Sequence, residues 1–168
     1  MMGMQRLLLL LCSLMLLSTA SGLTLRFHCR RVCPRGWTPI FGRCFKYVPT
    51  HLTWAQAERN CLSMHGNLAS VHSLAEYHRI QWLILRCSHY SRTAWIGGFD
   101  AVQEGLWFWA DGSFMRFTNW CPGEPNNAYF GRQHCMQMNY SGRRCWDDHV
   151  CNVRIPSVCV RKRSRFCG

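Results

Sequence analysis

Cysteine is the residue type in this sequence with the clearest chemical consequence. The 168-residue chain contains twelve cysteines, a density that is high for a reducing compartment and typical of disulfide-bonded exported domains. Cys12 lies in an N-terminal segment that we expect to be removed, so eleven remain and at least one is free or bonds another chain. No pair of Cys or His has zinc-finger spacing, and counting alone does not give the connectivity.

The other reactive side chains do not form the pattern of an enzyme. Asp and Glu together number 8 and are mostly scattered. No nucleophile elbow, phosphate-binding loop or His-Glu-x-x-His zinc motif occurs, and we therefore predict that the protein is not an enzyme. One modification motif is present, because Asn139-Tyr140-Ser141 is an N-glycosylation sequon in a polar turn.

The N-terminal segment predicts export. Residues 1–22 combine Arg6, an apolar run over 7–17 interrupted only by Ser13, and small residues, so cleavage after Ala20 or after Gly22 fits a signal peptide. The run is too short to cross a membrane, which needs about 20 apolar residues. We expect a secreted, extracellular protein with no membrane span.

The charge is strongly positive. Lys and Arg number 20 against 8 acidic residues, which gives a formal net charge of +12. Export excludes intracellular nucleic acid as a partner, although the charge alone could suggest one. The excess Arg is either solvated surface or an attraction to anionic partners such as sulfated glycans and bacterial envelopes.

The elements that must position these residues begin with two helices. Thr53 is a good N-cap, and Gln56 three residues later completes a capping box, so a helix is predicted to run to about Met64 and to stop at Gly66. Its apolar side chains recur on one face: Trp54, Ala57, Cys61 and Met64. Ser73 and Glu76 predict a second capping box. An apolar stripe follows it towards Leu85: Leu74, Tyr77, Ile80 and Ile84.

Short strands surround these helices. Residues 36–47 predict a hairpin with its turn at Gly42-Arg43. After Ser88 the sequence becomes rich in loops and short strands, which we expect at 95–98, 106–109, 135–138, 145–151 and 156–160. Helices followed by a strand-rich half predict an α+β domain.

Several motifs resemble one family. Trp95-Ile96-Gly97, Glu124-Pro125-Asn126 and Trp146-Asp147-Asp148, together with the cysteine spacing, are similar to a C-type lectin domain from about Cys33 to Cys159. The segment from Thr118 to Asn127 and the pair Cys145-Trp146 resemble the small secreted fish lectins and the fish type II antifreeze proteins. The resemblance implies two helices and two small antiparallel sheets with a long calcium-binding loop, stapled by disulfides. It divides the chain into a signal peptide (1–22), a basic arm (23–32), the lectin-like domain (33–160) and a basic tail (161–168).

The resemblance also implies a disulfide pattern. The family pattern pairs Cys33–Cys44, Cys61–Cys159 and Cys135–Cys151, and the fish subgroup adds Cys121–Cys145. Cys29, Cys87 and Cys167 are left over. Because the termini lie close together in this fold, Cys29–Cys167 is a reasonable pair, and Cys87 then remains for a covalent dimer. The alternative is that Cys29 or Cys167 bonds another chain.

The site follows from the same resemblance. Carried over position by position, the ligands of Ca²⁺ and of the sugar bound to it are Glu124, Asn126, Gln133, Asp147 and Asp148. Pro125 occupies a position that is cis in the family. Gln133 stands where Glu is common and Asp147 where Asn is common, and these two changes of charge cancel. The alternative is a degenerate loop whose carboxylates pair with Arg132, Arg143 and Arg144.

These residues also bear on the sugar. Glu-Pro-Asn at 124–126 is similar to family members that prefer mannose-type sugars, whereas aromatic side chains near the loop keep galactose open. We expect Trp120 in the core, and Tyr129 and Phe130 exposed. The leading hypothesis is a calcium-dependent lectin that recognises microbial glycans in innate immunity and gains avidity as a disulfide-linked homo-oligomer.

Two other functions remain open. The first is ice binding on the same scaffold, against which the charged loop and the scarcity of Thr after Thr118 weigh. The second is calcium-independent binding of anionic surfaces by a cationic protein.

Overall fold

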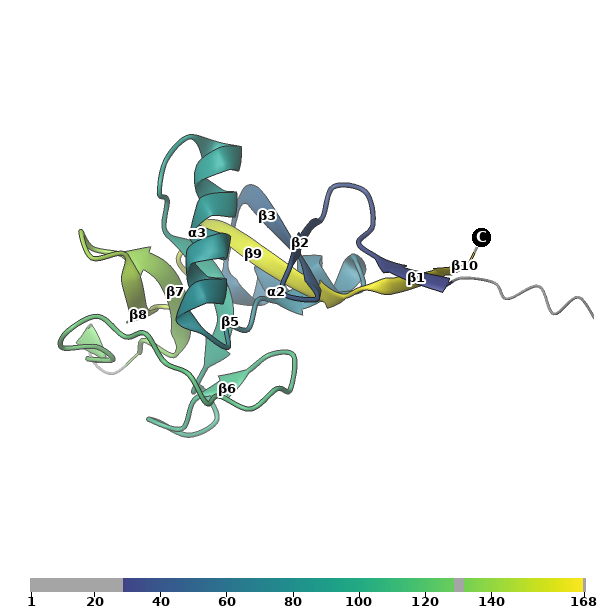
Figure 1. The fold of residues 1–168 in the computed structure, drawn as a ribbon. Coiled ribbons are helices and arrows are strands. Elements are labelled where there is room, and N and C mark those ends of the chain that lie inside the picture. Colours follow the sequence, from purple (N-terminus) through teal and green to yellow (C-terminus); the bar gives the residue numbers. More distant parts are fainter. Residues whose placement is uncertain (1–28, 129–131, 168) are drawn as a thin grey trace, which may run out of the picture. The chain divides into compact units, whose positions relative to one another are not determined.

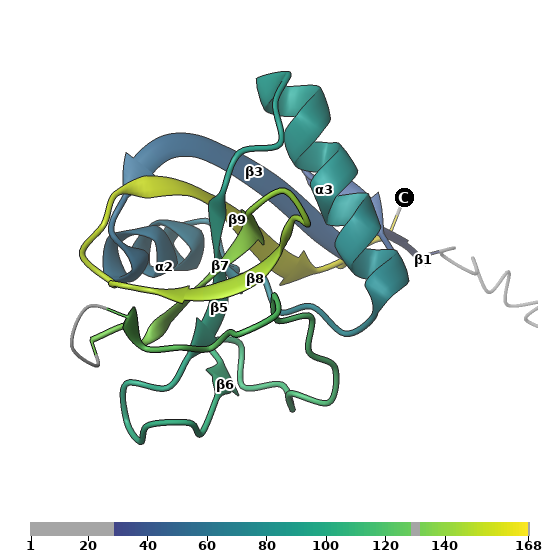
Figure 2. The same cartoon turned by 90° about the vertical axis from the view of Figure 1, so that its left-hand side faces the viewer.

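The computed structural model describes residues 29–128 and 132–167, and residues 30–166 form one compact unit. Figures 1 and 2 show its elements from two directions. In chain order these are β1 (Cys29–Val32), β2 (Thr38–Ile40), β3 (Arg43–Leu52), α2 (Trp54–Ser63), β4 (Asn67–Leu68), α3 (Leu74–Ser88), β5 (Ala94–Phe99), β6 (Phe108–Trp109), β7 (Cys135–Tyr140), β8 (Cys145–His149), β9 (Ile155–Lys162) and β10 (Ser164–Cys167). Among the described residues no helix is long and apolar enough to span a membrane.

The first hairpin turns one residue earlier than predicted. Its turn is formed by Phe41 and Gly42, with φ of 40° and 83°, and β2 and β3 leave it in antiparallel register. Positive φ at both central residues is the geometry of a tight hairpin turn whose twist matches that of the strands. Phe41 is consequently exposed rather than part of the core.

Helix α2 begins and ends as its sequence predicts. The Thr53 hydroxyl accepts the backbone N–H of Gln56 at 3.3 Å, and the Gln56 side chain accepts the backbone N–H of Thr53 at 3.2 Å. Met64 caps the C-terminal end. Ala57 and Cys61 are buried, and Trp54 and Met64 pack against the same core cluster, so the predicted apolar face is confirmed.

Helix α3 begins at the predicted cap, but its capping box is only half formed. The Ser73 hydroxyl accepts the N–H of Glu76. The Glu76 carboxylate turns instead to the backbone N–H of His72 and to the Arg43 guanidinium, whose Nη2 lies 2.6 Å from Oε2. Of the predicted stripe, the side chains of Tyr77, Ile80 and Ile84 are buried, whereas Leu74 and Leu85 at its ends are exposed.

The α+β class is confirmed, with one difference in how the strands join. Strands β2, β3, β9, β5, β7 and β8 are hydrogen-bonded in this order, with β4 paired to β9 and β6 to β5, and β1 pairs with β10 in a separate two-stranded sheet. The link that joins the main path is the parallel pair β5–β9. The antiparallel groups β2–β3–β9 and β5–β7–β8 are thus the expected small sheets, and this one parallel pair joins them.

Two core clusters hold the helices against the sheet. The larger contains the buried face of α3 together with Trp146, Met136 and Met138, and the smaller contains Ala57 and Cys61 of α2 with Trp95. Figure 2 shows the two helices apart, with strands of the sheet between them. Burial of these large side chains is the main stabilising contribution available to a domain of this size.

Four disulfides fasten the described part of the chain, and they are the four that the resemblance implied. They join Cys33 to Cys44, Cys61 to Cys159, Cys121 to Cys145 and Cys135 to Cys151. Cys87 is the free cysteine of the described residues and is exposed. The side chains of Cys29 and Cys167 lie outside the described ones, so their pairing stays a prediction. The predicted signal peptide also lies outside them.

Candidate calcium and carbohydrate site

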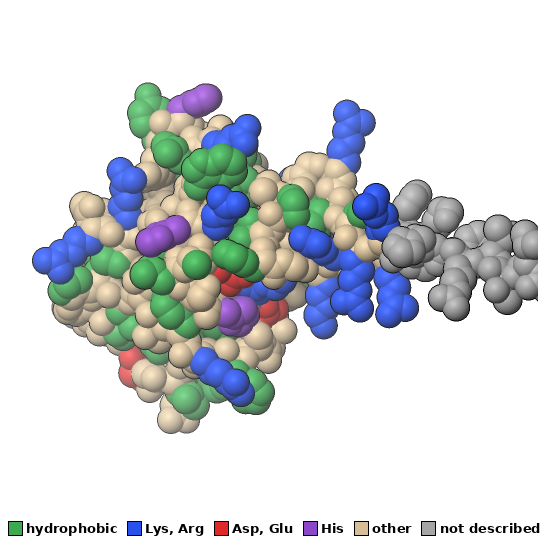
Figure 3. Space-filling view, in the orientation of Figure 1, with side chains coloured by type: hydrophobic (Ala, Val, Ile, Leu, Met, Phe, Trp, Pro, Cys, Tyr) green, Lys and Arg blue, Asp and Glu red, His purple; other side chains and the backbone are tan. Residues whose placement is uncertain are grey.

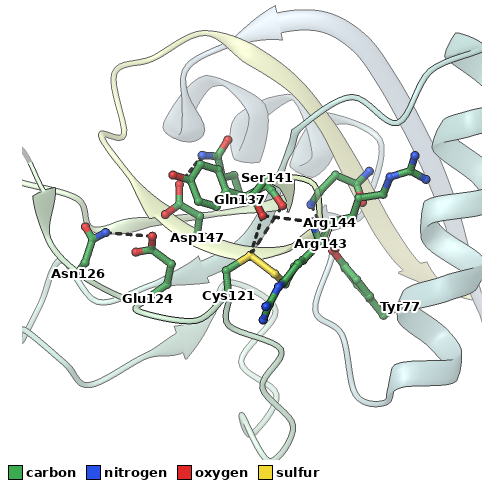
Figure 4. Close-up of a disulfide and its surroundings, with 12 residues drawn as sticks. Tyr77, Cys121, Glu124, Asn126, Gln137, Ser141, Arg143, Arg144 and Asp147 are labelled. Atoms are coloured by element: carbon green, nitrogen blue, oxygen red, sulfur yellow. Dashed lines mark hydrogen bonds between the residues drawn. A yellow bond between two sulfur atoms is a disulfide. The ribbon is translucent and has the colours of Figure 1, made fainter.

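Three carboxylates meet where the loop after Cys121 crosses β8. Oxygen atoms of Glu124, Asp147 and Asp148 lie within 4.8 Å of one another. Glu124 comes from the loop, and Asp147 and Asp148 are neighbours in β8. Figure 4 shows the Glu124 and Asp147 side chains pointing toward each other from these two elements. The structure thus brings together three of the five residues that the sequence predicts as ligands.

Strand β7 fixes the orientation of Asp147. Gln137 lies opposite Asp147 in the β7–β8 register, and its amide nitrogen donates to Asp147 Oδ2 at 2.6 Å. Gln137 is 5% exposed, so its side chain has little room to take another orientation. No sequence motif marks Gln137, because its contact with Asp147 depends on the pairing of two strands.

Asp148 fastens the loop to β8. Its side chain is fully buried and accepts the backbone N–H of Asn126 at 2.9 Å and that of Asn127 at 2.8 Å. The Glu124–Pro125 peptide bond is cis, as in the family pattern. Asp148 therefore has a structural role in addition to its predicted one, since it shapes the loop that carries Glu124.

The two amide residues of the predicted set lie on either side of the carboxylates. Asn126 Nδ2 donates to Glu124 Oε1 at 2.9 Å, while its amide oxygen accepts the N–H of Ala128. Gln133 is buried, and its amide nitrogen donates to the backbone oxygen of Asp148 at 2.9 Å. Asn126 thus touches the cluster through its nitrogen, and Gln133 touches the backbone behind it.

The concentration of negative charge perturbs the proton affinity of the site. Burial, and then the charge of Asp147, raise the pKa of Glu124 to about 7. Burial likewise raises the pKa of Asp147, against the opposing effect of the Gln137 hydrogen bond. In the described part of the chain, Arg132, Arg143 and Arg144 form no ion pair with these carboxylates. The alternative of a loop neutralised by these arginines is therefore not what the structure contains.

Two buried oxygens test whether a hard cation fits this site. Glu124 Oε2 and Gln133 Oε1 are buried and have no hydrogen-bond partner. A buried acceptor without a donor costs about 1–3 kcal/mol, and a cation removes that cost. Carboxylate and amide oxygens are the ligands that Ca²⁺ prefers. The donor set therefore fits Ca²⁺, with Glu124, Asp147 and Asp148 as its charged members.

A second group of titratable residues contacts the loop through the Asn127 side chain. His134 Nδ1 lies 3.1 Å from Asp100 Oδ1 and 3.6 Å from Glu104 Oε2. The other oxygen of Asp100 accepts the N–H of Gly105, and Glu104 accepts from the side chain of Asn127. No sequence motif marks this cluster, because His134 follows Glu104 only 30 residues later in the chain.

The aromatic residues near the loop differ in role. Trp120 is half-buried and packs against the larger core cluster, with its ring 4.7 Å from that of Trp107 and 5.9 Å from that of Trp146. It thus lies at the margin of the core in which we expected it. Tyr129 and Phe130, which we expected to be exposed, lie outside the described residues.

The asparagine of the sequon is buried. Asn139 is 4% exposed. Its amide nitrogen donates to the backbone oxygen of Arg92, and its amide oxygen accepts from Gln81, both at 3.0 Å. A glycan on that nitrogen would break the first bond, so glycosylation of Asn139 stays a prediction that the folded geometry opposes.

Known proteins are similar to this chain over most of its length. The profile of a family described as "Lectin C-type domain" matches residues 50–161. Ladderlectin of Oncorhynchus mykiss is 46% identical over 133 residues, which are 79% of this chain and 70% of that protein. The galactose-specific lectin nattectin of Thalassophryne nattereri is 40% identical over 129 residues, which are 77% of this chain and 80% of nattectin.

A solved structure shows the same fold. The crystal structure of a calcium-independent type II antifreeze protein superimposes with a TM-score of 0.73 at 37% identity and covers 82% of this chain and 99% of the other. Fish lectins and a type II antifreeze protein are thus among its relatives, as the motifs indicated. Because the family profile covers most of the compact unit and the four disulfides are those of the family pattern, the chain belongs to the C-type lectin domain family.

Proposed function

We propose that the protein is a secreted, non-enzymatic lectin that binds carbohydrate with the help of Ca²⁺. The observation that carries the proposal is the meeting of the carboxylates of Glu124, Asp147 and Asp148, where Glu124 Oε2 is buried without a hydrogen-bond partner. Asn126 and Gln133 complete the set of residues that would hold the ion. When bound, Ca²⁺ supplies affinity for hydroxyl oxygens, because it takes about six to eight oxygen ligands.

The chain's own residues would orient the sugar. Glu124 offers an acceptor and Asn126 a donor, and the two side chains already lie within hydrogen-bond distance of each other. Two neighbouring hydroxyls of one sugar need such a donor and acceptor side by side. Glu-Pro-Asn supports a mannose-type preference with equatorial hydroxyls, and the similarity to nattectin supports galactose as the second candidate.

Affinity chromatography tests this proposal. The mature chain is passed over mannose and galactose resins with Ca²⁺ and then eluted with chelator. We expect retention on the mannose resin, release by chelator, and loss of retention in Glu124→Gln, which keeps the side-chain shape and removes the charge. The melting temperature of Glu124→Gln without Ca²⁺ should equal or exceed that of the parent protein, because the substitution relieves repulsion. Retention that ignores both chelator and the substitution would refute the site.

Ice binding is the second candidate function, supported by the similarity to a type II antifreeze protein. The three clustered acids favour the lectin, because an ice-binding face is flat and carries little charge. Shaped ice crystals in dilute protein, unaffected by Glu124→Gln, would favour ice binding. Salt-released and chelator-insensitive binding to all anionic surfaces alike would favour the cationic alternative.

We further propose recognition of microbial glycans as a covalent homodimer. A single sugar site binds weakly, and linking two sites raises avidity. The exposed thiol of Cys87 at the C-terminal end of α3 offers the link. Non-reducing electrophoresis of the secreted protein should show a dimer that disappears in Cys87→Ser, with the melting temperature unchanged. A dimer that persists in Cys87→Ser would transfer the role to Cys29 or Cys167.

A further inference from the structure

A large cavity lies where β9 passes into β10, and it shares no residue with the loop site. Its volume is about 740 Å³, within the range of cavities that bind small ligands. Arg161, Lys162 and Arg163 form one wall, and Arg43 and Asp111 lie on another. Figure 3 shows Lys and Arg side chains gathered at this end of β9.

Two arginines in the cavity hold unused donors. Arg161 is fixed in place, because its Nη1 donates to the backbone oxygen of Met64 at 3.1 Å and its guanidinium lies 5.6 Å from the centre of the Trp37 ring. Its Nε is nevertheless buried without an acceptor, and so is the Nε of Arg163. Both Nε atoms are closed to solvent, so a ligand in the cavity can reach only the terminal guanidinium nitrogens. Among the described residues, those of Arg163 make no hydrogen bond or ion pair, and Arg161 uses only Nη1, so donors remain for a ligand.

The acidic groups nearby do not use these donors. Asp111 accepts from Ser70 and Ser113, and its Oδ2 lies 3.8 Å from Arg43 Nη1. Arg43 also pairs with Glu76. Among the described residues, Arg161, Lys162 and Arg163 form no ion pair. Three positive charges in one wall thus remain without a counter-charge from the protein.

The positive charge continues beyond the cavity along the strand pair β1–β10. Arg165 lies in β10, and Arg30 and Arg31 lie in β1, which pairs with it, and all three side chains are exposed. Arg30 and Arg31 are neighbours in one strand, so their side chains point to opposite faces of it. Exposed cations that continue beyond a cavity on a strand pair match a chain of anionic groups better than a single small ion. Predicted export places acidic polysaccharides, rather than nucleic acid, within reach.

We propose that this cavity binds a sulfate group of an acidic polysaccharide, whose neighbouring sulfates lie along Arg165 and the strand pair β1–β10. The sulfate oxygens accept the N–H groups of Arg161 and Arg163 in charge-assisted hydrogen bonds, and Lys162 contributes charge. This second site needs no metal and does not depend on the proposed function of the loop. A chain with both sites can hold a neutral sugar and an acidic polysaccharide at the same time.

Calorimetry with a heparin-derived octasaccharide tests the proposal, with the mature chain in chelator at physiological ionic strength. The double variant Arg161→Gln/Arg163→Gln should weaken binding about tenfold or more, because it removes two charge-assisted donors. The matched control is Arg143→Gln/Arg144→Gln, which removes the same charge from the exposed turn between β7 and β8. We expect the control to weaken binding less than about threefold, since it affects only long-range attraction.

Several outcomes would overturn the proposal. If the two double variants lose the same affinity for the octasaccharide, net charge and not the cavity explains the binding. Binding of single-stranded DNA as tightly as the octasaccharide would exclude a sulfate-specific site, and binding of uncharged dextran would exclude an ionic one. We expect inorganic sulfate at millimolar concentration to compete with the octasaccharide. If it does not compete, the cavity is not where the sulfate group binds. If Arg161→Gln disturbs folding through Trp37, Lys162→Gln/Arg163→Gln serves in its place.

Discussion

Glu124 holds a proton more tightly than a free carboxyl group, because burial and then the neighbouring carboxylates favour its neutral form. Burial and the charge of Asp147 raise its pKa from 4.5 to about 7. A group that binds its proton more tightly in the folded state than in the unfolded state makes the folded state less stable as that proton is lost. The calcium-free protein therefore loses stability from this group as the pH rises from 4.5 to about 7.

This sign gives a prediction for the calcium-free and calcium-loaded protein. We expect the melting temperature in chelator to fall across that pH window, and Glu124→Gln to reduce the fall, because Gln does not titrate. Added Ca²⁺ should raise the melting temperature more at the upper end of the window than at the lower, since protons and Ca²⁺ compete for the same oxygens. Calorimetric scans at several pH values measure both effects. Equal pH dependence of the parent protein and Glu124→Gln would contradict the assignment.

At the level of single residues, the sequence predicts which residues lie together at the candidate site better than it predicts the hydrogen bonds that each side chain makes. Glu124, Asp147 and Asp148, three of the five residues predicted as ligands, lie together, and their binding of an ion stays a prediction. The role of Gln137 depends on the β7–β8 register, which is set by tertiary packing and not by neighbours in sequence. The amide oxygen of Asn126 is taken by Ala128, a loop contact that no sequence motif encodes.

At the level of elements, the predictions that hold are those controlled by local interactions. Thr53 and Gln56 lie three residues apart, and their capping box forms as predicted. Glu76 lies equally near Ser73, but Arg43, 33 residues earlier in the chain, draws its carboxylate away. The ion pair with a partly buried guanidinium outweighs a single bond to the N-cap backbone, and nothing within α3 reveals it.

The close approach of β5 and β4 gives a prediction for one glycine. A Cβ added at Gly97 would lie 2.6 Å from the backbone oxygen of Leu68, which cannot move independently of β4. We expect Gly97→Ala to lower the free energy of unfolding by about 1–3 kcal/mol, as overpacking does. Gly142→Ala is the matched control, because a Cβ there meets nothing within 4 Å, and it should change stability by less than about 0.5 kcal/mol. Urea unfolding measures both, and equal effects would contradict the stated contact.

At the level of the whole molecule, the disulfides differ in the length of chain that they close. Cys61–Cys159 spans 98 residues and ties α2 to β9, whereas Cys33–Cys44 spans 11. Chain entropy alone predicts losses of about 4.7 and about 2.8 kcal/mol when each pair is replaced by alanines. We expect Cys61→Ala/Cys159→Ala to be the more destabilising double variant, also because both of its cysteines are fully buried. Denaturant unfolding tests the order, and the reverse order would show that loop length does not control it.

Because Asn139 is buried, its modification depends on whether this part of the chain has already folded during export. The transferase that recognises Asn-x-Ser acts on accessible chain, and access ends once β7 has closed against Gln81 and Arg92. A glycan attached to Asn139 before that closure would remove the hydrogen bond to Arg92, so we expect glycosylated molecules to be less stable in this part of the sheet. Intact-mass measurement of the exported protein shows whether the glycan is attached.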